Sequence, residues 1–552
     1  MTDQIPPPPP PPPAEAPTVG ESPAPARRSI KGLVIGGIAV VAILALAGGA
    51  FAVYQKLDGG GAQPHDVLPA SVVAYARVDL DPSASQKIAL LKMIRKFPEA
   101  ADDIGIKSAD QDVRELLVKE ALKEADCDLT YDKDVEPWLG NRLGFGLDKG
   151  ETPLVAIQVT DEGKAEKGIK ALFECAGEKA SVAFLDGYAI VAEEQGKADS
   201  AVKAATKSPL ADDKAFVEDT DELGESGVAS VWADFKAVGE LPGFKAGFDA
   251  AYGAGGDELL EQAGTVAAAL RVDGSTLELA GITGLTDAYD VKAAPIGKLP
   301  ADTAAALSIG GIGDQVVEQY NALLDAFGQG FGFGLTGQPP VSPSITEDMT
   351  AEEKALFEKS LGASGPPDPQ SFITEFERST GLDLPEDLET LFGDGLTVAI
   401  GADNLEKLPT LAGPSDVAAL DVAVQMTTDP DKAFDLATRL AALASQAGIA
   451  LSTTQTDDGA VVATNQDAAD ALGDPGKLGE ESAFTSVMPY GDETLNGLFV
   501  NVGAIVDKLL EANPPGGIAE ALEQASKVSA FGLSVGKDDD HTLFSVRLNL
   551  AE

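Results

Sequence analysis

An uncharged apolar segment near the N-terminus constrains this chain more than any other feature. From Gly32 to Tyr54 the sequence contains no Asp, Glu, Lys or Arg. A helix of this length spans roughly 34 Å at about 1.5 Å per residue, which is enough for a hydrocarbon core of about 30 Å. The segment therefore predicts a single transmembrane helix over residues 32–54.

Charges beside this segment predict its orientation. Arg27, Arg28 and Lys31 lie just before it, whereas only Lys56 and Asp58 lie just after it. Cytoplasmic flanks carry the excess of Lys and Arg, so we expect a plasma-membrane protein with a cytoplasmic N-terminus and extracytoplasmic C-terminal domains.

A cleaved signal peptide is the alternative, because Ala50-Phe51-Ala52 offers a small-x-small cleavage site. The apolar stretch is longer than the roughly 7 to 15 residues of a signal-peptide core, which favours a retained anchor. Gly32 and Gly36 form a G-x-x-x-G motif, a candidate contact for a homodimer through the membrane helix, although glycine is common in such helices.

The first 31 residues form a Pro-rich tail with an unbroken proline run from Pro6 to Pro13. Such a run adopts an extended polyproline II conformation, so residues 1–31 are expected to be a disordered cytoplasmic tail. The tail is either a docking segment for a cytoplasmic partner with an aromatic groove or a solvated spacer. Residues 55–65 include Gly59-Gly60-Gly61 and predict a flexible tether.

The chain beyond the helix is strongly acidic, since 89 acidic against 40 basic residues give a net charge of −49. Such a surface repels phosphate backbones and anionic lipid head groups, which argues against nucleic-acid binding and membrane adsorption. No D-x-D-x-D-G calcium loop occurs. The charge favours solubility at an exposed cell surface over salt adaptation or cation storage.

Two stretches, 66–289 and 299–552, carry the same landmarks in the same order on either side of a linker at 290–298. The pairs are Leu68-Pro69-Ala70 with Leu299-Pro300-Ala301, Asp134–Gly140 with Asp387–Gly393, Val155–Thr160 with Val422–Thr427, Asp186-Gly187 with Asp458-Gly459, Leu210–Phe216 with Leu478–Phe484, and Val231–Asp234 with Phe499–Val502. This repetition predicts two homologous domains. The second contains a loop insertion at 336–369, rich in Pro, Ser and Glu.

Within each half, segments of period two alternate with amphipathic helical segments, such as 277–281 and 90–97. Asp-Gly turns between several of the predicted strands favour hairpins. We therefore expect an α+β fold: after the transmembrane helix, two domains that each have a mostly antiparallel sheet with helices packed on one face.

The chain has two cysteines, Cys127 and Cys175. Both follow the membrane helix, in a compartment where disulfides persist, so we expect them to be bonded to each other. The bridge would contribute roughly 4 kcal/mol in the chain-entropy model. Leu382 stands near the Cys127 position in the second half and no cysteine replaces Cys175, so the fold does not require the bridge. Without a C-x-x-C motif, redox catalysis is disfavoured.

Several segments resemble a known family. They are the Pro-rich tail with its single helix, DVLPASVVAYARVDLDPSASQKI at 66–88, CDLTYDKDVEPWLG at 127–140, and DGYAIVAEEQGKADSAVKAA at 186–205. Together they resemble actinobacterial single-pass membrane proteins of the domain of unknown function 3352 family. The resemblance implies the anchored architecture and assigns no reaction, ligand or catalytic residue.

The sequence offers no pattern typical of an enzyme. His65 and His541 are its two histidines, one in the tether and one beside an acidic turn, and no G-x-S-x-G occurs. Ser200–Lys203 fits S-x-x-K without the companion motifs, and Gly332–Gly337 fits G-x-G-x-x-G without a preceding strand. We expect no catalytic residue, no cofactor and no metal ligand.

Large apolar residues alternate with glycine after a predicted helix that includes Phe327. They are Phe331, Phe333 and Leu335. These four residues are a candidate apolar patch for a partner, a lipid or a membrane surface, or alternatively they pack under the neighbouring helix.

These observations favour a non-enzymatic, membrane-tethered binding or scaffolding component of the cell envelope, with an unidentified envelope protein or lipid as partner. A carrier of lipid or another apolar ligand is the first alternative. A carboxylate-based cell-wall hydrolase is the second, because carboxylates are abundant.

Overall fold

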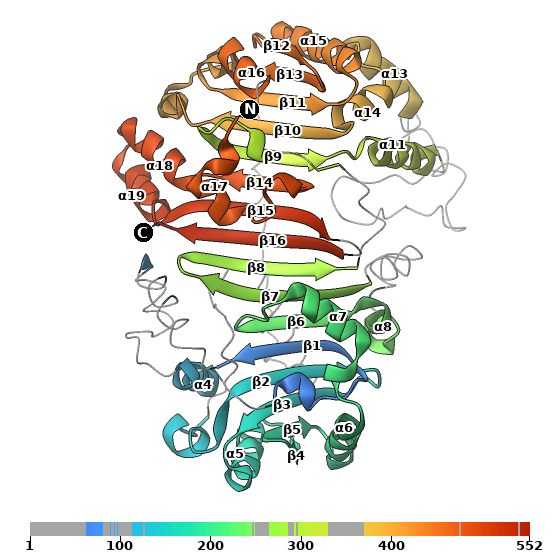
Figure 1. Ribbon diagram of the computed structural model, residues 1–552, viewed down its shortest axis with the longest axis vertical. Helices are drawn as coiled ribbons and strands as arrows, with labels where there is room; N and C mark the ends of the chain where they lie inside the picture. The colour runs from blue at the N-terminus through green and yellow to red at the C-terminus, as the bar shows by residue number, and fades with distance from the viewer. Residues whose placement is uncertain are drawn as a thin grey trace, which may run out of the picture.

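The computed structural model describes residues 62–80, 89, 93, 96–97, 113–124, 127–245, 248, 264–284, 292–293, 296–328, 369–473, 476–538 and 541–551. Among these residues, strands from both halves of the chain form a single 16-stranded antiparallel sheet (Figure 1). The predicted α+β class with antiparallel strands is confirmed, but the strands of the two halves belong to one continuous sheet and not to a separate sheet in each half.

The first half contributes the strands at one end of the sheet. They are β1 (Val72–Asp79), β2 (Leu139–Asp148), β3 (Pro153–Val159), β4 (Ser181–Leu185), β5 (Tyr188–Ala192), β6 (Ala229–Asp234), β7 (Thr265–Asp273) and β8 (Thr276–Thr283).

The second half contributes the strands at the other end. They are β9 (Thr303–Gly310), β10 (Gly395–Gly401), β11 (Val422–Thr427), β12 (Ser452–Thr456), β13 (Gly459–Ala463), β14 (Asn496–Val500), β15 (Val528–Asp538) and β16 (His541–Leu550).

The strand order is the same in the two halves. From one edge it runs β4-β5-β3-β2-β1-β6-β7-β8, and from the other β12-β13-β11-β10-β9-β14-β15-β16. The halves meet where β8 pairs antiparallel with β16, and Ala280 faces Ser545 across this joint. Both residues lie four positions after the first residue of their strand, so a pseudo-twofold axis passes between them.

Helices and short helical turns of the first half are η1 (Pro64–Asp66), α4 (Val113–Glu124), η2 (Tyr131–Val135), α5 (Glu162–Cys175), α6 (Gln195–Lys207), η3 (Leu210–Asp212), α7 (Lys214–Leu223) and α8 (Phe235–Gly239). Those of the second half are η5 (Ile296–Lys298), α11 (Gly313–Gly328), α13 (Pro369–Thr380), α14 (Glu386–Phe392), η6 (Leu405–Thr410), η7 (Pro414–Ala419), α15 (Pro430–Gln446), α16 (Gln466–Gly473), η8 (Leu478–Glu480), α17 (Ser482–Val487), η9 (Gly491–Glu493), α18 (Val502–Glu511) and α19 (Gly516–Ala525).

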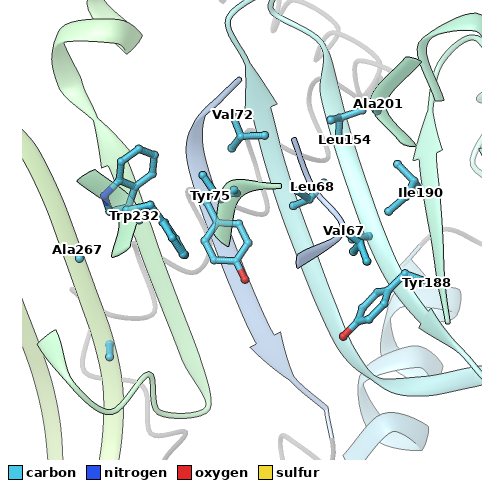
Figure 2. Packing of buried hydrophobic residues seen from close by; sticks show 14 of the residues in the cluster. Val67, Leu68, Val72, Tyr75, Leu154, Tyr188, Ile190, Ala201, Trp232 and Ala267 are labelled. Carbon is cyan, nitrogen blue, oxygen red and sulfur yellow. The ribbon is translucent and has the colours of Figure 1, made fainter. Parts of the chain in front are cut away.

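Helices cover both faces of the sheet, so the prediction of helices on one face is wrong. On β3, Leu154 and Ala156 join a buried cluster with residues of α6 and α7, partly drawn in Figure 2. The alternate residues Val155 and Ile157 join a second cluster with residues of α5. A strand that is apolar on both sides buries about twice the apolar area of a strand that is apolar on one side. It therefore needs a layer of helices or other elements on each face of the sheet.

Landmarks matched between the halves occupy corresponding elements, but the residue pairing shifts at more than one of them. Leu185 and Tyr188 flank one turn and Thr456 and Gly459 flank the other, so Tyr188, not Gly187, corresponds to Gly459. Trp232 of β6 faces Tyr75 of β1, and Phe499 of β14 faces Ala306 of β9. Trp232 packs edge-on against Phe216 as Phe499 does against Phe484. Trp232 therefore corresponds to Phe499, which is one position before Val500, the residue that the sequence match had paired with it.

Helix starts are fixed by side chains that accept from backbone N–H groups. The carboxylate of Asp234 accepts from the Ala237 N–H at the start of α8, and the amide oxygen of Asn501 accepts from the Ala504 N–H at the start of α18. Such caps satisfy the donors that a helix start leaves open. Their correspondence supports the shifted alignment.

No helix among the described residues is both long and apolar enough to cross a membrane. The segment Gly32–Tyr54 and its flanking residues Arg27, Arg28 and Lys31 lie outside those residues, so the membrane helix stays a prediction. The insertion predicted at 336–369 also lies outside them, apart from Pro369.

Candidate functional site

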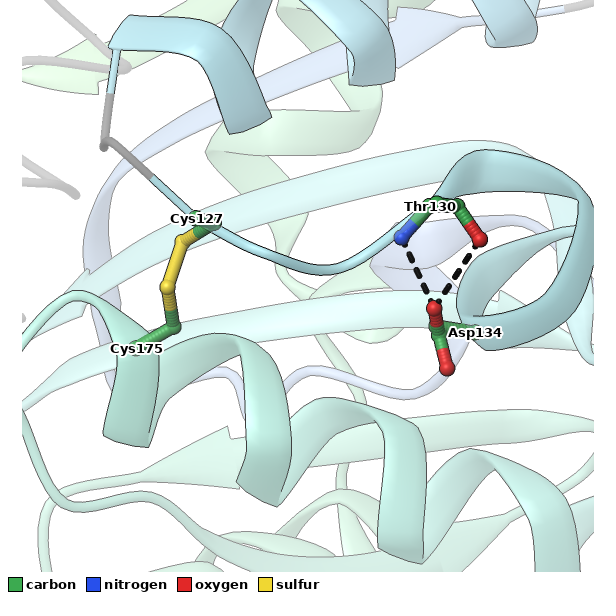
Figure 3. Close-up of a disulfide and its surroundings, with 4 residues drawn as sticks. All are labelled: Cys127, Thr130, Asp134 and Cys175. Carbon is green, nitrogen blue, oxygen red and sulfur yellow. Dashed lines mark hydrogen bonds between the residues drawn. A yellow bond between two sulfur atoms is a disulfide. The ribbon is translucent and has the colours of Figure 1, made fainter.

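Cys127 and Cys175 form a disulfide, as predicted, with their Cα atoms 5.9 Å apart (Figure 3). The bond joins the C-terminus of α5 to the segment that leads into η2. In that segment Asp134 Oδ2 accepts from the N–H of Thr130 at 2.7 Å and from its hydroxyl at 3.1 Å. The bridge therefore fastens a helix to a turn that is already organised by a carboxylate.

A partly buried ion pair between α14 and α15 lies near the corresponding place in the second half. Asp387 Oδ2 accepts from the Asp383 N–H at 2.6 Å, the same four-residue spacing as in Asp134 and Thr130. Counting back from these aspartates, Thr380 corresponds to Cys127, two residues before Leu382. Arg439 of α15 donates to both carboxylate oxygens of Asp387 and to the Gly381 carbonyl at 3.1 Å.

These contacts fix the charge states of the pair. Burial raises the pKa of Asp387, but hydrogen bonds from Arg439 and from the Asp383 N–H outweigh it and hold that pKa below its usual value. The same bond to Asp387 raises the pKa of Arg439. Both groups stay charged, and the pair fastens α15 to its neighbouring turn as the disulfide fastens α5.

Residues 62–66, just after the expected membrane helix, pack on the sheet of the first half. The Tyr188 hydroxyl donates to the Ala62 carbonyl at 2.8 Å. The His65 ring packs against Tyr75 and Phe216, with centroids 6.1 and 5.3 Å away. The part of the predicted tether that the structure describes is therefore attached to the domain.

A buried charged group lies on the same face of β1 and β2. Arg77 donates to Ser226 Oγ at 2.6 Å, and Asp79 Oδ2 lies 3.5 Å from Arg77 Nη2 and 4.0 Å from Arg142 Nε. Burial raises the pKa of Tyr188 to about 12, although Arg142 opposes the shift. The corresponding positions of the second half carry Ser308, Gly310 and Gly395, so this cluster belongs to the first half alone.

Charged residues from both halves also meet at the β8–β16 joint. Glu278 of β8 accepts from Arg547 Nε and from Ser545 Oγ, each at 2.8 Å, and lies 3.6 Å from Arg271 Nη1. Burial raises the pKa of the neighbouring Tyr490 to about 12, with Glu278 acting in the same direction. Two cations thus hold one carboxylate across the joint.

A second polar contact crosses the joint near α7. Asp219, 3% exposed, accepts from the Trp232 indole N–H at 2.6 Å. The His541 imidazole of β16 lies 3.6 Å from the other oxygen of Asp219. His541, predicted beside an acidic turn, therefore joins the two halves.

Three cavities open on the second half, on the side of the sheet covered by α16 and α17. The first, about 750 Å³, is lined at the joint by residues that include Lys298, Lys477, Tyr490, Asp492 and Arg547. The second, about 290 Å³, is lined mainly by Asp302, Asp403, Asn404, Asp421 and Asp467 with alanines of α16.

The third cavity, about 760 Å³, lies between the β12–β13 hairpin and α16, and we call it the hairpin cavity. It is lined by Lys298, Leu299, Gln425, Thr454, Gln455, Thr456, Asp457, Asp458, Asp470, Leu472 and Gly473. Hydroxyl, amide and carboxylate groups dominate this lining. The hairpin cavity is the candidate functional site, because it combines the size of a ligand pocket with several polar groups.

These groups can hydrogen-bond to a ligand. Within the described part of the chain, no three or more His, Cys, Asp or Glu residues are arranged to hold a metal ion. Near the hairpin cavity, Gln466 donates to Asp470 at 2.7 Å, and Thr456 donates to Asp458 at 3.1 Å. These carboxylates are held by neutral donors, which leaves acceptor positions open for a ligand's hydroxyl or amine groups.

The sequence-predicted patch of Phe327, Phe331, Phe333 and Leu335 is not part of this site. Phe327 belongs to α11, but its side chain and the other three residues lie outside the described part of the chain. The hairpin cavity escaped prediction, because only a position-by-position alignment of the halves reveals it.

Comparisons with known proteins gave no match: no family model, curated protein or solved structure is similar to this chain. The resemblance to the domain of unknown function 3352 family stays a prediction.

Proposed function

We propose that this chain is a non-enzymatic, membrane-anchored component of the cell envelope that holds a binding surface away from the membrane. In this proposal residues 32–54 span the plasma membrane, and the domains that follow are extracytoplasmic. The binding surface is the cavity-bearing side of the second half.

The observation that carries the proposal is where the chain enters the sheet. Tyr188 and Ala62 make their contact on β5, next to the edge strand β4, at the end of the sheet farthest from β12. Residues 55–61 reach at most about 25 Å when fully extended. The first-half end of the sheet is therefore held near the membrane.

The size of the sheet determines how far the second half lies from the membrane. Sixteen strands spaced about 4.8 Å apart extend over roughly 70 Å. When the strands stack away from the membrane, the second-half cavities lie several tens of ångströms from the lipid surface. A rigid platform of this kind suits presentation of a binding surface to a partner in the envelope.

Two further features support an extracytoplasmic place. The Cys127–Cys175 disulfide is of a kind that persists in oxidising compartments. The net charge of −49 keeps the domains soluble and repels anionic head groups, so contact with lipid is confined to the anchor.

We also propose that the halves, 66–289 and 299–552, arose by duplication of one domain. Their identical strand order supports this origin. An apolar-ligand carrier finds less support, because the hairpin cavity is lined mainly by polar and charged side chains. A carboxylate-based hydrolase remains the weaker alternative, and its nearest candidate is the 290 Å³ cavity with four aspartates.

Protease treatment of intact cells tests the proposal. With an N-terminal and a C-terminal tag on the full chain, we expect the protease to remove the C-terminal tag and spare the N-terminal one. Replacing Arg27, Arg28 and Lys31 with glutamate should leave more of the C-terminal tag intact and expose more of the N-terminal tag, because the positive charges that orient the helix are lost.

A matched variant with Lys119, Lys123 and Lys133 changed to glutamate alters charge by the same amount and should leave the pattern unchanged. If the C-terminal tag survives on intact cells and is digested after lysis, the extracytoplasmic placement is wrong.

A further inference from the structure

The hairpin cavity exists because small residues of the second half replace large residues of the first. Gln195 of α6 donates to Asp199 at 2.8 Å, and Gln466 of α16 donates to Asp470 at 2.7 Å. These matching contacts align the two helices, so Val202 corresponds to Gly473.

The hairpins align in the same way. Leu185 faces Tyr188 across the β4–β5 turn, and Thr456 faces Gly459 across the β12–β13 turn. Leu185 therefore corresponds to Thr456 and Tyr188 to Gly459.

In the first half these side chains fill the space under the hairpin. Leu185, Val202 and Ala62 pack against the buried cluster, and Tyr188 is fully buried (Figure 2 labels Tyr188). In the second half, Thr456 and Gly473 line the hairpin cavity, which is open at about 760 Å³. The cavity is thus a specific difference between otherwise corresponding sites.

The lining selects a class of ligand. Thr454, Thr456 and Gln425 offer hydroxyl and amide groups, and Asp457, Asp458 and Asp470 offer carboxylates. A phosphorylated or carboxylated ligand would meet three carboxylates and a single cation, Lys298, and a lipid chain would meet Leu299 and Leu472 among polar side chains. Vicinal hydroxyl groups match this set, since each can donate to a carboxylate and accept from an amide.

We propose that the hairpin cavity binds a saccharide, with the sugar's hydroxyl groups on the carboxylate and amide side chains and its C–H faces against Leu299 and Leu472. This proposal names the ligand class for the binding role proposed above. It rests on that role, because the saccharide is expected to come from the cell envelope. The cavity volume lies within the roughly 300 to 1,000 Å³ of ligand pockets.

The test measures binding of chitotetraose and cellotetraose to the purified full chain in detergent by isothermal titration calorimetry. We expect at least one of them to bind. Gly473→Val with Thr456→Leu restores the first-half residues and should weaken binding at least tenfold. A Cβ at position 473 would lie 3.7 Å from Thr456 Cγ2 and 3.9 Å from Thr454 Cγ2, so it fits without a clash.

Two further variants separate filling of the cavity from loss of folding. Gln425→Ala keeps the cavity open, removes one amide, and should weaken binding severalfold. Ala442→Val on the exposed side of α15 adds apolar carbons away from the cavity and should leave binding unchanged.

Failure of both saccharides to bind the folded chain, or equal binding by the filled variant, overturns the proposal. Tighter binding of tetralysine than of either saccharide also overturns it, because the site would then select cations. Since these measurements use purified protein, their failure leaves the protease result on cells unaffected, and the reverse also holds.

Discussion

Replacement of Arg439 by methionine tests whether an ion pair does in the second half what the disulfide does in the first. Arg439 forms a two-oxygen contact with Asp387 and also donates to the Gly381 carbonyl. Methionine keeps most of the side chain's aliphatic packing and removes every one of these donors. The substitution therefore leaves Asp387 with the Asp383 N–H alone.

The structure sets the size of the effect. Breaking a fully buried ion pair by removing one partner costs about 3 to 5 kcal/mol. Asp387 is 8% exposed, but the Arg439 side chain is 28% exposed, so water reaches the pair from one side. We therefore expect Arg439→Met to lower the free energy of unfolding by about 2 to 3 kcal/mol.

Urea unfolding followed by far-ultraviolet circular dichroism measures this change. Asp435→Ala is the matched control, because it removes only the exposed partner of the same guanidinium, whose carboxylate lies 2.9 Å from Arg439 Nε. That variant should lose no more than about 0.5 kcal/mol. A double-mutant cycle with Asp387→Asn should give a coupling energy above about 1 kcal/mol.

The pH dependence supplies a second check. Because the folded-state pKa of Asp387 is lowered, its contribution to stability is present above the ordinary carboxyl pKa of about 3.9 and is lost as pH falls. The difference between the wild type and Arg439→Met should therefore shrink below about pH 4. Equal losses for Arg439→Met and Asp435→Ala at neutral pH would refute the reasoning.

Two further predictions concern the disulfide and a buried tyrosine. Replacing Cys127 and Cys175 by alanine should lower the free energy of unfolding of the first half by roughly 4 kcal/mol. Fluorescence of Trp138 and Trp232, both in that half, should then report unfolding at a lower urea concentration. An unchanged urea midpoint would contradict this prediction. Since burial raises the pKa of Tyr490 to about 12, its contribution to stability should be complete below pH 10 and disappear between about pH 10 and 12. Urea unfolding of Tyr490→Phe should then vary less with pH over this interval, and identical profiles would exclude the effect.

Local chemistry in the sequence predicted much of the fold. The Asp186-Gly187 turn joins β4 to β5, and the Asp457-Asp458 turn joins β12 to β13, one residue before the Asp458-Gly459 landmark; the cysteines are bonded. Turns and helix caps depend on neighbouring residues, and a disulfide depends on one residue type. These features can therefore be predicted from a single sequence. The repeated order of such landmarks predicted the two similar halves, which composition alone did not.

Other features depend on contacts that leave little trace in the sequence. Side chains such as Glu278 and Arg547 meet where β8 pairs with β16, but the sequence alone does not reveal that they are partners, because backbone groups of any strand edge pair alike. The sequence of β5 is apolar at consecutive positions, and all five of its residues are buried. Such a run indicates a strand covered on both faces, but the alternating pattern of other strands favoured helices on one face only. The hairpin cavity follows from differences such as Leu185 and Thr456, which become informative only once the register of each hairpin is known.

The pairing of β8 with β16 has a consequence for the origin of the chain. A lone ancestral half would expose the edge of its last strand, and two copies would associate there as a homodimer about the axis between Ala280 and Ser545. Such an assembly dissociates on dilution, whereas joining both copies in one polypeptide makes the contact independent of concentration. Under the proposed duplication, fusion would also let the copies diverge, one acquiring a disulfide and the other an open chamber.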